Sequence, residues 1–165
     1  VGVLNPTLAV ALIAPFLLMT LPAIVYGLWL RFARRPAAGV IEAPLALTNP
    51  LSLATAIKFA LLYAVIGVLV KAATQLDLLQ HGLLPLSFVS GLTDMDAISL
   101  SMAGSQLSGQ VPLLFATKAV IVGAIANSIL KAGFAISLGS PALRREVTLV
   151  LGATAACGLA SLWLV

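Results

Sequence analysis

Four polar side chains lie within stretches that are otherwise apolar, and their types suit the binding of a cation or a proton. Asp94 and Asp96 are two residues apart in "SGLTDMDAIS", and Asn127 and Lys131 are four residues apart in "IANSILKAG". Residues four apart share one face of a helix, so Asn127 and Lys131 are expected to point the same way. Carboxylate and amide oxygens bind hard cations, carboxylates carry protons inside membranes, and a lysine neutralises a carboxylate.

The sequence leaves three arrangements of these side chains open. In the first, an aspartate forms an ion pair with Lys131. In the second, Asp94 and Asp96 bind a metal or another cation together with the Asn127 oxygen. In the third, a protonated aspartate takes part in a proton relay. A simpler alternative is helix capping, in which Thr93 or Asp94 accepts amide protons and Asp96 interacts favourably with the helix dipole.

The composition indicates that these residues lie in a membrane protein. Of the 165 residues, 61% are hydrophobic and 8% are charged, which is typical of proteins embedded in lipid. Lipid offers the backbone no hydrogen-bond partner, so apolar stretches near ~20 residues long are expected to cross as helices. We predict an all-α integral membrane protein with four membrane-spanning helices, at residues 7–30, 51–73, 111–138 and 147–165. Residues 1–165 are expected to form a single helical membrane domain.

A further hydrophobic segment between residues 82 and 106 is interrupted in the middle. Its apolar part before the aspartates is about a dozen residues long and is too short to cross the bilayer alone. Ser90, Gly91 and Thr93 are expected to mark a helix break, so that two half-helices meet at the aspartates. Discontinuous helices inside membranes usually mark a binding site. The segment therefore either re-enters the membrane or crosses it as a broken helix.

The basic residues favour the re-entrant alternative. They form two small clusters, Arg31 with Arg34 and Arg35, and Arg144 with Arg145. If the broken segment returns to its own side, both clusters face the cytoplasm, as the positive-inside rule prefers. Because the basic residues are otherwise scattered, a nucleic-acid partner is not expected.

Few of the remaining residues suggest other chemistry. The chain has one cysteine, Cys157, and one histidine, His81, which excludes a disulfide framework and a Cys/His zinc cluster formed by this chain alone. The sequence contains no evident set of nucleophile, base and orienting residue, so an enzyme is not predicted. No cofactor is expected other than a bound cation.

Three segments carry a family resemblance. Residues 58–70, "KFALLYAVIGVLV", residues 90–103, "SGLTDMDAISLSMA", and residues 125–135, "IANSILKAGFA", resemble the conserved C-terminal membrane domain of MgtC/SapB-related bacterial proteins, a domain of unknown function (DUF4010). The resemblance implies a multi-pass protein of the bacterial inner membrane. It also suggests a loose link to divalent metals through an MgtC-type partner domain, although no such domain is visible in this sequence.

Two functions of different classes follow from these observations. The first is an ion transporter or channel-like domain, for a cation or a proton-coupled metal, with Asp94, Asp96, Asn127 and Lys131 at its site. The second is a structural or regulatory membrane subunit in which the aspartates and lysines form a buried ion-pair network. The small size of the chain suggests a homodimer or other membrane subunits as partners, alongside the lipid bilayer. Because it begins at Val1 and ends within an apolar run at Val165, we expect it to be either a processed product or part of a longer protein.

Overall fold

The structure, a computed structural model, describes residues 1–33 and 82–165 and, between them, residues 53, 57, 60, 61, 64 and 68. In these residues it contains helices, turns and irregular segments, and no β-strand. The helices are α1 (Pro6–Ala33), α3 (Leu83–Thr93), α4 (Met95–Leu107), α5 (Leu113–Leu138) and α6 (Pro141–Ser161). The prediction of an all-helical fold is confirmed for this part of the chain.

Helix α1 begins at a proline, which suits a first turn because proline lacks an amide hydrogen that this turn would leave unpaired. Asn5 precedes it, and the Leu8 amide donates to the Asn5 Oδ1 at 3.0 Å. The helix continues through Pro15 and Pro22 to Ala33. Tyr26 and Trp29 stack near its C-terminal end, with ring centroids 5.8 Å apart.

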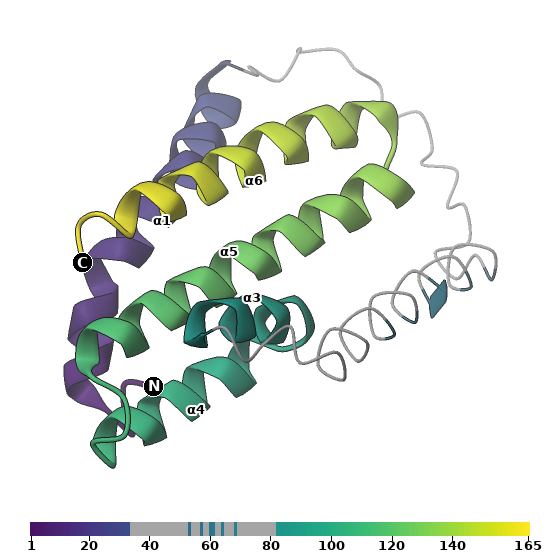
Figure 1. The fold of residues 1–165 in the computed structure, drawn as a ribbon. Coiled ribbons are helices and arrows are strands. Elements are labelled where there is room, and N and C mark those ends of the chain that lie inside the picture. Colours follow the sequence, from purple (N-terminus) through teal and green to yellow (C-terminus); the bar gives the residue numbers. More distant parts are fainter. Residues whose placement is uncertain (34–52, 54–56, 58–59, 62–63, 65–67, 69–81) are drawn as a thin grey trace.

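Helix α5 is the centre of the bundle. Figure 1 shows α5 between α6 on one side and α3 with α4 on the other, and α5 contacts each of the other four described helices. Most of its buried residues are small or β-branched, including Ala116, Ala119, Gly123 and Ala126. Small residues let neighbouring helices approach closely, which suits packing within a membrane.

The relative directions of α1, α5 and α6 show which helix ends lie together at each end of the bundle. Helices α5 and α6 are antiparallel, because only two residues connect them and Ile125 packs against Gly158. Helix α6 is also antiparallel to α1, since Met19 also approaches Gly158 and the later residue Trp29 lines a groove with the earlier residue Leu149. Helices α1 and α5 therefore run in the same direction.

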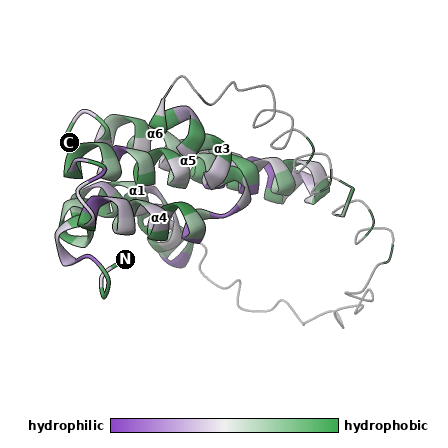
Figure 2. Cartoon of the chain, turned by 60° about the horizontal axis from the view of Figure 1, so that its bottom comes forward, coloured by the Kyte–Doolittle hydropathy of each residue, from purple (hydrophilic) through white to green (hydrophobic). Residues whose placement is uncertain are grey.

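The first and third predicted spans are confirmed as helices of sufficient length. Among the described helices, α1 and α5 are long and apolar enough to cross a membrane. The α1 surface carries large exposed apolar side chains such as Val10 at 68% and Val25 at 62% exposure. Figure 2 shows hydrophobic residues spread over the helices, with the hydrophilic ones in scattered patches. These surfaces support association with a membrane.

The structure does not confirm the other two predicted spans. Residues 51–73 lie largely outside the described residues, so the second span stays a prediction. The fourth was predicted at residues 147–165, but α6 begins earlier, at Pro141, and ends at Ser161. Its first turns contain Arg144, Arg145 and Glu146, and the apolar part that remains is shorter than the ~20 residues of a full crossing. Four spans are therefore not established by the described helices.

Candidate ion site at the bend between α3 and α4

Asp94 separates α3 from α4 and caps the second of them. Its backbone is extended, with φ −151° and ψ 107°, and its Oδ1 accepts hydrogen bonds from the amides of Asp96 at 2.8 Å and Ala97 at 3.2 Å. An N-cap carboxylate satisfies amides that the first turn leaves unpaired. The two half-helices predicted to meet at the aspartates are therefore present. Asp94 caps α4, which was one of the alternatives that the sequence left open.

The residues predicted to break the helix lie just before the bend. Ser90, Gly91 and Thr93 all belong to the last part of α3, and the break itself falls at Asp94. The Ser90 carbonyl oxygen accepts from the Asp94 amide at 2.8 Å and from the Thr93 hydroxyl at 2.9 Å. Ser90 and Thr93 thus complete the end of α3.

Both carboxylates are exposed in this part of the structure. Asp96 lies in the first turn of α4, where a negative charge interacts favourably with the N-terminal end of the helix dipole. In the hydrogen bonds among the described residues Asp94 uses only Oδ1, so its Oδ2 has no partner in this part of the chain and could bind a proton or a cation. Among the described residues, neither aspartate has a cationic side chain within ion-pair distance.

Gly91 has a different role from the predicted one, because it brings α3 against the backbone of α5. A methyl group at residue 91 would overlap the Cα and carbonyl oxygen of Gly123. The absence of a side chain at residue 91 allows this close approach of the two backbones. The sequence pattern did not identify the contact, since the two glycines are far apart along the chain.

The contacts of Gly123 also show that the chain folds back at Asp94. A methyl group on Gly123 would lie 3.5 Å from the Ser87 carbonyl oxygen in α3 and 3.0 Å from the Ile98 Cγ2 in α4. The Ser87 carbonyl oxygen and the Ile98 Cγ2 are therefore no farther apart than the sum of these two distances. Residues eleven positions apart in an uninterrupted helix are separated by about 16 Å along the axis. Helices α3 and α4 thus form a bent pair rather than one straight rod.

The bend lies at mid-length of α5. This helix has 26 residues, about 39 Å, and Gly123 is close to its centre. Asp94 follows Gly91, the residue that touches Gly123, by three residues. If α5 crosses the bilayer, both aspartates are therefore near its middle. An ionised side chain facing lipid at this depth costs roughly 2.5–3.5 kcal/mol on insertion scales, which favours neutralisation, hydration or coverage.

Asn127 and Lys131 follow Gly123 along the same face of α5, but the structure does not join them to the aspartates. Asn127 is half-buried and Lys131 is exposed. Within the described part of the chain, no side-chain hydrogen bond or ion pair links Asn127 or Lys131 to Asp94 or Asp96. In the same part, no group of three or more His, Cys, Asp or Glu side chains is placed to hold a metal. A metal bound by the two carboxylates therefore stays a prediction.

Asn5 forms a buried polar contact that the sequence pattern did not predict. Its side chain is 1% exposed, and its Nδ2 donates to the Ala103 carbonyl oxygen at 3.1 Å and to the Gln106 Oε1. Together with the cap on α1, these bonds join the start of α1 to the end of α4. The Asn-Pro pair is a local signal for a helix start, but nothing local indicates the contact with α4.

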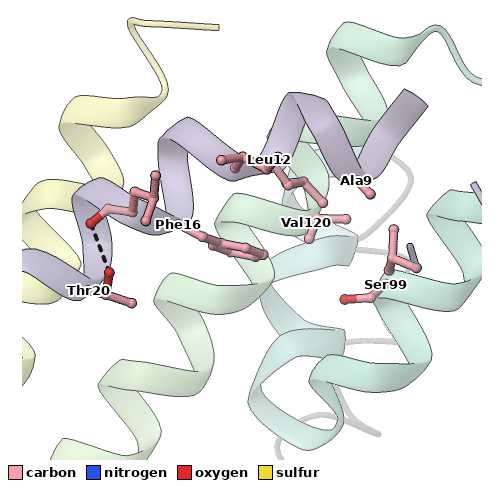
Figure 3. A pocket seen from close by; sticks show the side chains of 9 residues that line it. Ala9, Leu12, Phe16, Thr20, Ser99 and Val120 are labelled. Atoms are coloured by element: carbon pink, nitrogen blue, oxygen red, sulfur yellow. Dashed lines mark hydrogen bonds between the residues drawn. The ribbon is translucent and has the colours of Figure 1, made fainter. Parts of the chain in front are cut away.

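An apolar groove lies beside α4, between α1 and α5. Its volume is about 390 Å³, and Figure 3 shows Leu12 and Phe16 of α1 near Val120 of α5, with Ser99 of α4 across from them. The Ser99 hydroxyl donates to the Met95 carbonyl oxygen at 2.8 Å, within its own helix. The Thr20 hydroxyl likewise donates to the Leu17 carbonyl oxygen at 2.9 Å. The groove therefore presents a largely apolar wall, which suits hydrocarbon rather than an ion.

Comparison with known proteins establishes a family. The model of a domain of unknown function (DUF4010) matches residues 1–139. The chain belongs to this family. The DUF4010 match extends from the chain start to the end of α5 and so includes the bend at Asp94 and the crossing at Gly123. Helix α6 lies beyond it, although it packs against both α1 and α5.

The sequence of this DUF4010 protein is also similar to that of a protein from Aquifex aeolicus (strain VF5), described as an uncharacterized protein. The two are 32% identical over 100 residues, which cover 61% of this chain and 43% of the relative. The matched region thus spans less than half the length of that relative. No solved structure matches the chain. The relationship to MgtC/SapB-related proteins stays a prediction.

Proposed function

We propose that this DUF4010 domain carries a proton or a monovalent cation across the bacterial inner membrane, through a site at the bend between α3 and α4. The observation that carries the proposal is the position of Asp94 and Asp96. They lie at a break between half-helices, near the middle of α5, with no ion-pair partner among the described residues. Broken helices with acidic side chains at membrane depth are typical of ion and proton pathways.

The charge of the site favours a proton or a monovalent ion. If Lys131 of α5 also belongs to the site, two carboxylates and one lysine leave about one net negative charge, which suits these species better than a tightly held divalent ion. In this proposal Asp94 and Asp96 are ligands or proton carriers, and Asn127 supplies an oxygen. Lys131 competes with the ion for an aspartate, and pairs with that aspartate when no ion is bound.

The directions of the helices support a topology in which the arginines of α1 and α6 face the same side of the membrane. Arg31 at the end of α1 and Arg144 and Arg145 at the start of α6 lie at one end of the bundle, since α1 and α6 are antiparallel. The turn between α4 and α5 lies at the other end. The positive-inside rule then favours an orientation in which all these arginines face the cytoplasm.

The experiment measures ion movement by the full chain in liposomes. A pH-sensitive dye reports proton movement, and separate Na⁺ and K⁺ gradients report cation movement. We expect flux from the wild type and a loss of at least tenfold in the double variant Asp94→Asn with Asp96→Asn. Absence of wild-type flux, or equal flux from the double variant, would overturn the proposal.

A second candidate is a structural or regulatory subunit, and the two backbone hydrogen bonds to Asp94 Oδ1 favour it. In that case the aspartate is needed only as a helix cap. Asparagine caps helices about as well as aspartate does. A structural role therefore predicts that Asp94→Asn changes neither the folded yield nor any ion dependence.

A further inference from the structure

The apolar groove beside α4 extends along that helix in the direction of Asp96. At its other end α1 and α4 are joined, because the Asn5 side chain of α1 donates to the Ala103 carbonyl oxygen of α4. Earlier along α4, Ser99 lines the groove together with the later α1 residue Phe16 (Figure 3). The two helices therefore run antiparallel along the groove. The part of α4 that precedes Ser99 leads away from the junction at Asn5, and it carries Asp96.

Helix geometry places Asp96 on the groove side of α4. Asp96 precedes Ser99 by three residues and Ala103 by seven, so the three residues share one face of the helix. Ala103 meets α1, and Ser99 lines the groove. Asp96 is one turn farther along the same face, about 4.5 Å from Ser99 along the axis. A carboxylate therefore lies at the rim of the groove.

This carboxylate is available to a ligand. Asp96 is exposed, and its backbone amide, rather than its side chain, takes part in the cap at Asp94. Among the described residues, no side chain forms a hydrogen bond or an ion pair with the Asp96 carboxylate. A carboxylate at membrane depth that faces neither water nor a cation is costly. The charge at the rim therefore favours a positively charged partner.

The wall of the groove determines what kind of cation fits. Its volume of about 390 Å³ is within the range of small-molecule sites. The described lining is apolar except for the Ser99 and Thr20 hydroxyls, each of which donates within its own helix. Bare inorganic ions would lose their hydration here without gaining oxygen ligands. An apolar body is accommodated, and the half-buried Phe16 ring lies where it can contact a cation through its face.

We propose that this groove binds a monovalent organic cation with an apolar body, with the body between α1 and α5 and the positive charge beside Asp96. The inference rests on the proposed function, because it names the class of ion that the site would carry. Neither half of the arrangement selects this ligand alone. The wall selects hydrocarbon, and the carboxylate at its rim selects positive charge over a neutral or anionic lipid.

The test measures binding of radiolabelled tetraphenylphosphonium to the purified full chain in detergent, by equilibrium dialysis. This probe carries one positive charge within an apolar body. We expect saturable binding to the wild type and a loss of about tenfold in Asp96→Asn, which removes the charge and keeps the shape. Glu146→Gln is the matched control, because Glu146 lies at the start of α6, at the arginine end of the bundle, and should keep the wild-type affinity.

Competing compounds and a second pair of variants test the groove itself. Triphenylphosphine oxide is apolar but uncharged, and tetramethylammonium is charged but small. Each should compete at least tenfold more weakly than unlabelled tetraphenylphosphonium. Ser99→Leu fills the groove beside Asp96 and should lower the affinity. Ser101→Leu, at an exposed position of α4 that is not among the lining residues, should not.

The outcomes separate this inference from the proposed function. Unchanged affinity in Asp96→Asn, or equal competition by triphenylphosphine oxide, would overturn the inference, because the groove would then hold an apolar body without regard to charge. Absence of tetraphenylphosphonium binding by a chain that still moves protons or Na⁺ in liposomes would also overturn it and would leave the proposed function intact. Charge-dependent binding without any ion flux would support the site and overturn the transport proposal.

Discussion

Asn5 and Asp94 both cap helices, but their surroundings differ. Asn5 is buried and uses its oxygen for α1 and its nitrogen for α4. Asp94 is exposed, and one of its two carboxylate oxygens makes both of its described hydrogen bonds. At the scale of single residues, Asn5 therefore has a structural role, while Asp94 retains the capacity to bind a proton or an ion.

Replacement of Asn5 should destabilise the domain. Asn5→Ala removes the cap on the Leu8 amide and leaves the Gln106 side chain without its partner. We expect a loss of about 2 kcal/mol in the free energy of unfolding, measured by denaturant titration in detergent. Ser137→Ala is the control, because this exposed hydroxyl bonds only within its own helix. Equal stability of the two variants would show that the contact with α4 contributes nothing.

Two replacements of Asp94 separate capping from charge. Asp94→Ala removes the acceptor for the Asp96 and Ala97 amides and should cost about 1 kcal/mol of stability. Asp94→Asn keeps an oxygen at the same place and should unfold within about 0.5 kcal/mol of the wild type. Thermal unfolding in the same detergent measures both. A large loss of stability in Asp94→Asn would mean that the negative charge itself holds the fold.

At the scale of elements, the crossing of α3 over α5 positions the aspartates. Gly91 and Gly123 let the backbones of α3 and α5 approach closely. Ile98 of α4 also packs against Gly123. The sequence predicted the broken helix because its apolar part was too short to cross and was followed by two acids. It did not predict the contact between Gly91 and Gly123. A glycine just before a helix break is read as part of the break, and the sequence alone does not reveal a contact with a residue so far along the chain.

The glycine crossing can be tested with a matched pair of substitutions. Gly91→Ala places a methyl group against the Gly123 backbone and should cost about 1–3 kcal/mol, because the helices must move apart. Gly104→Ala on α4 meets open space and should be neutral or slightly stabilising, since alanine favours helix. Unfolding of both variants in detergent measures the difference. Tolerance of Gly91→Ala at wild-type stability would contradict the close approach of α3 and α5.

At the scale of the whole molecule, the described arginines lie at one end of the bundle and the uncharged turn after α4 at the other. The sequence predicted this separation only if the broken segment re-enters the membrane, an alternative that stays a prediction. Hydropathy alone did not predict where the fourth helix begins and ends. A helix start is set by caps, here Ser140 before Pro141, rather than by the first apolar residue.

Cysteine labelling in intact cells tests this orientation. In a background of Cys157→Ser, we expect Gln110→Cys, in the turn between α4 and α5, to react with a membrane-impermeant maleimide from outside. Phe32→Cys, exposed at the arginine end, should react only after the membrane is opened. Labelling of both positions from the same side would contradict the parallel arrangement of α1 and α5 across the membrane.

If Asp94 carries an ion in addition to capping α4, ion movement depends on the charge of its side chain. The most direct measurement compares wild type and Asp94→Asn in liposomes, with the folded fraction and the ion flux determined on the same samples. The proposal predicts that Asp94→Asn remains folded while its flux falls at least tenfold below that of the wild type. Equal flux at equal folded fraction would contradict it and would leave Asp94 as a helix cap.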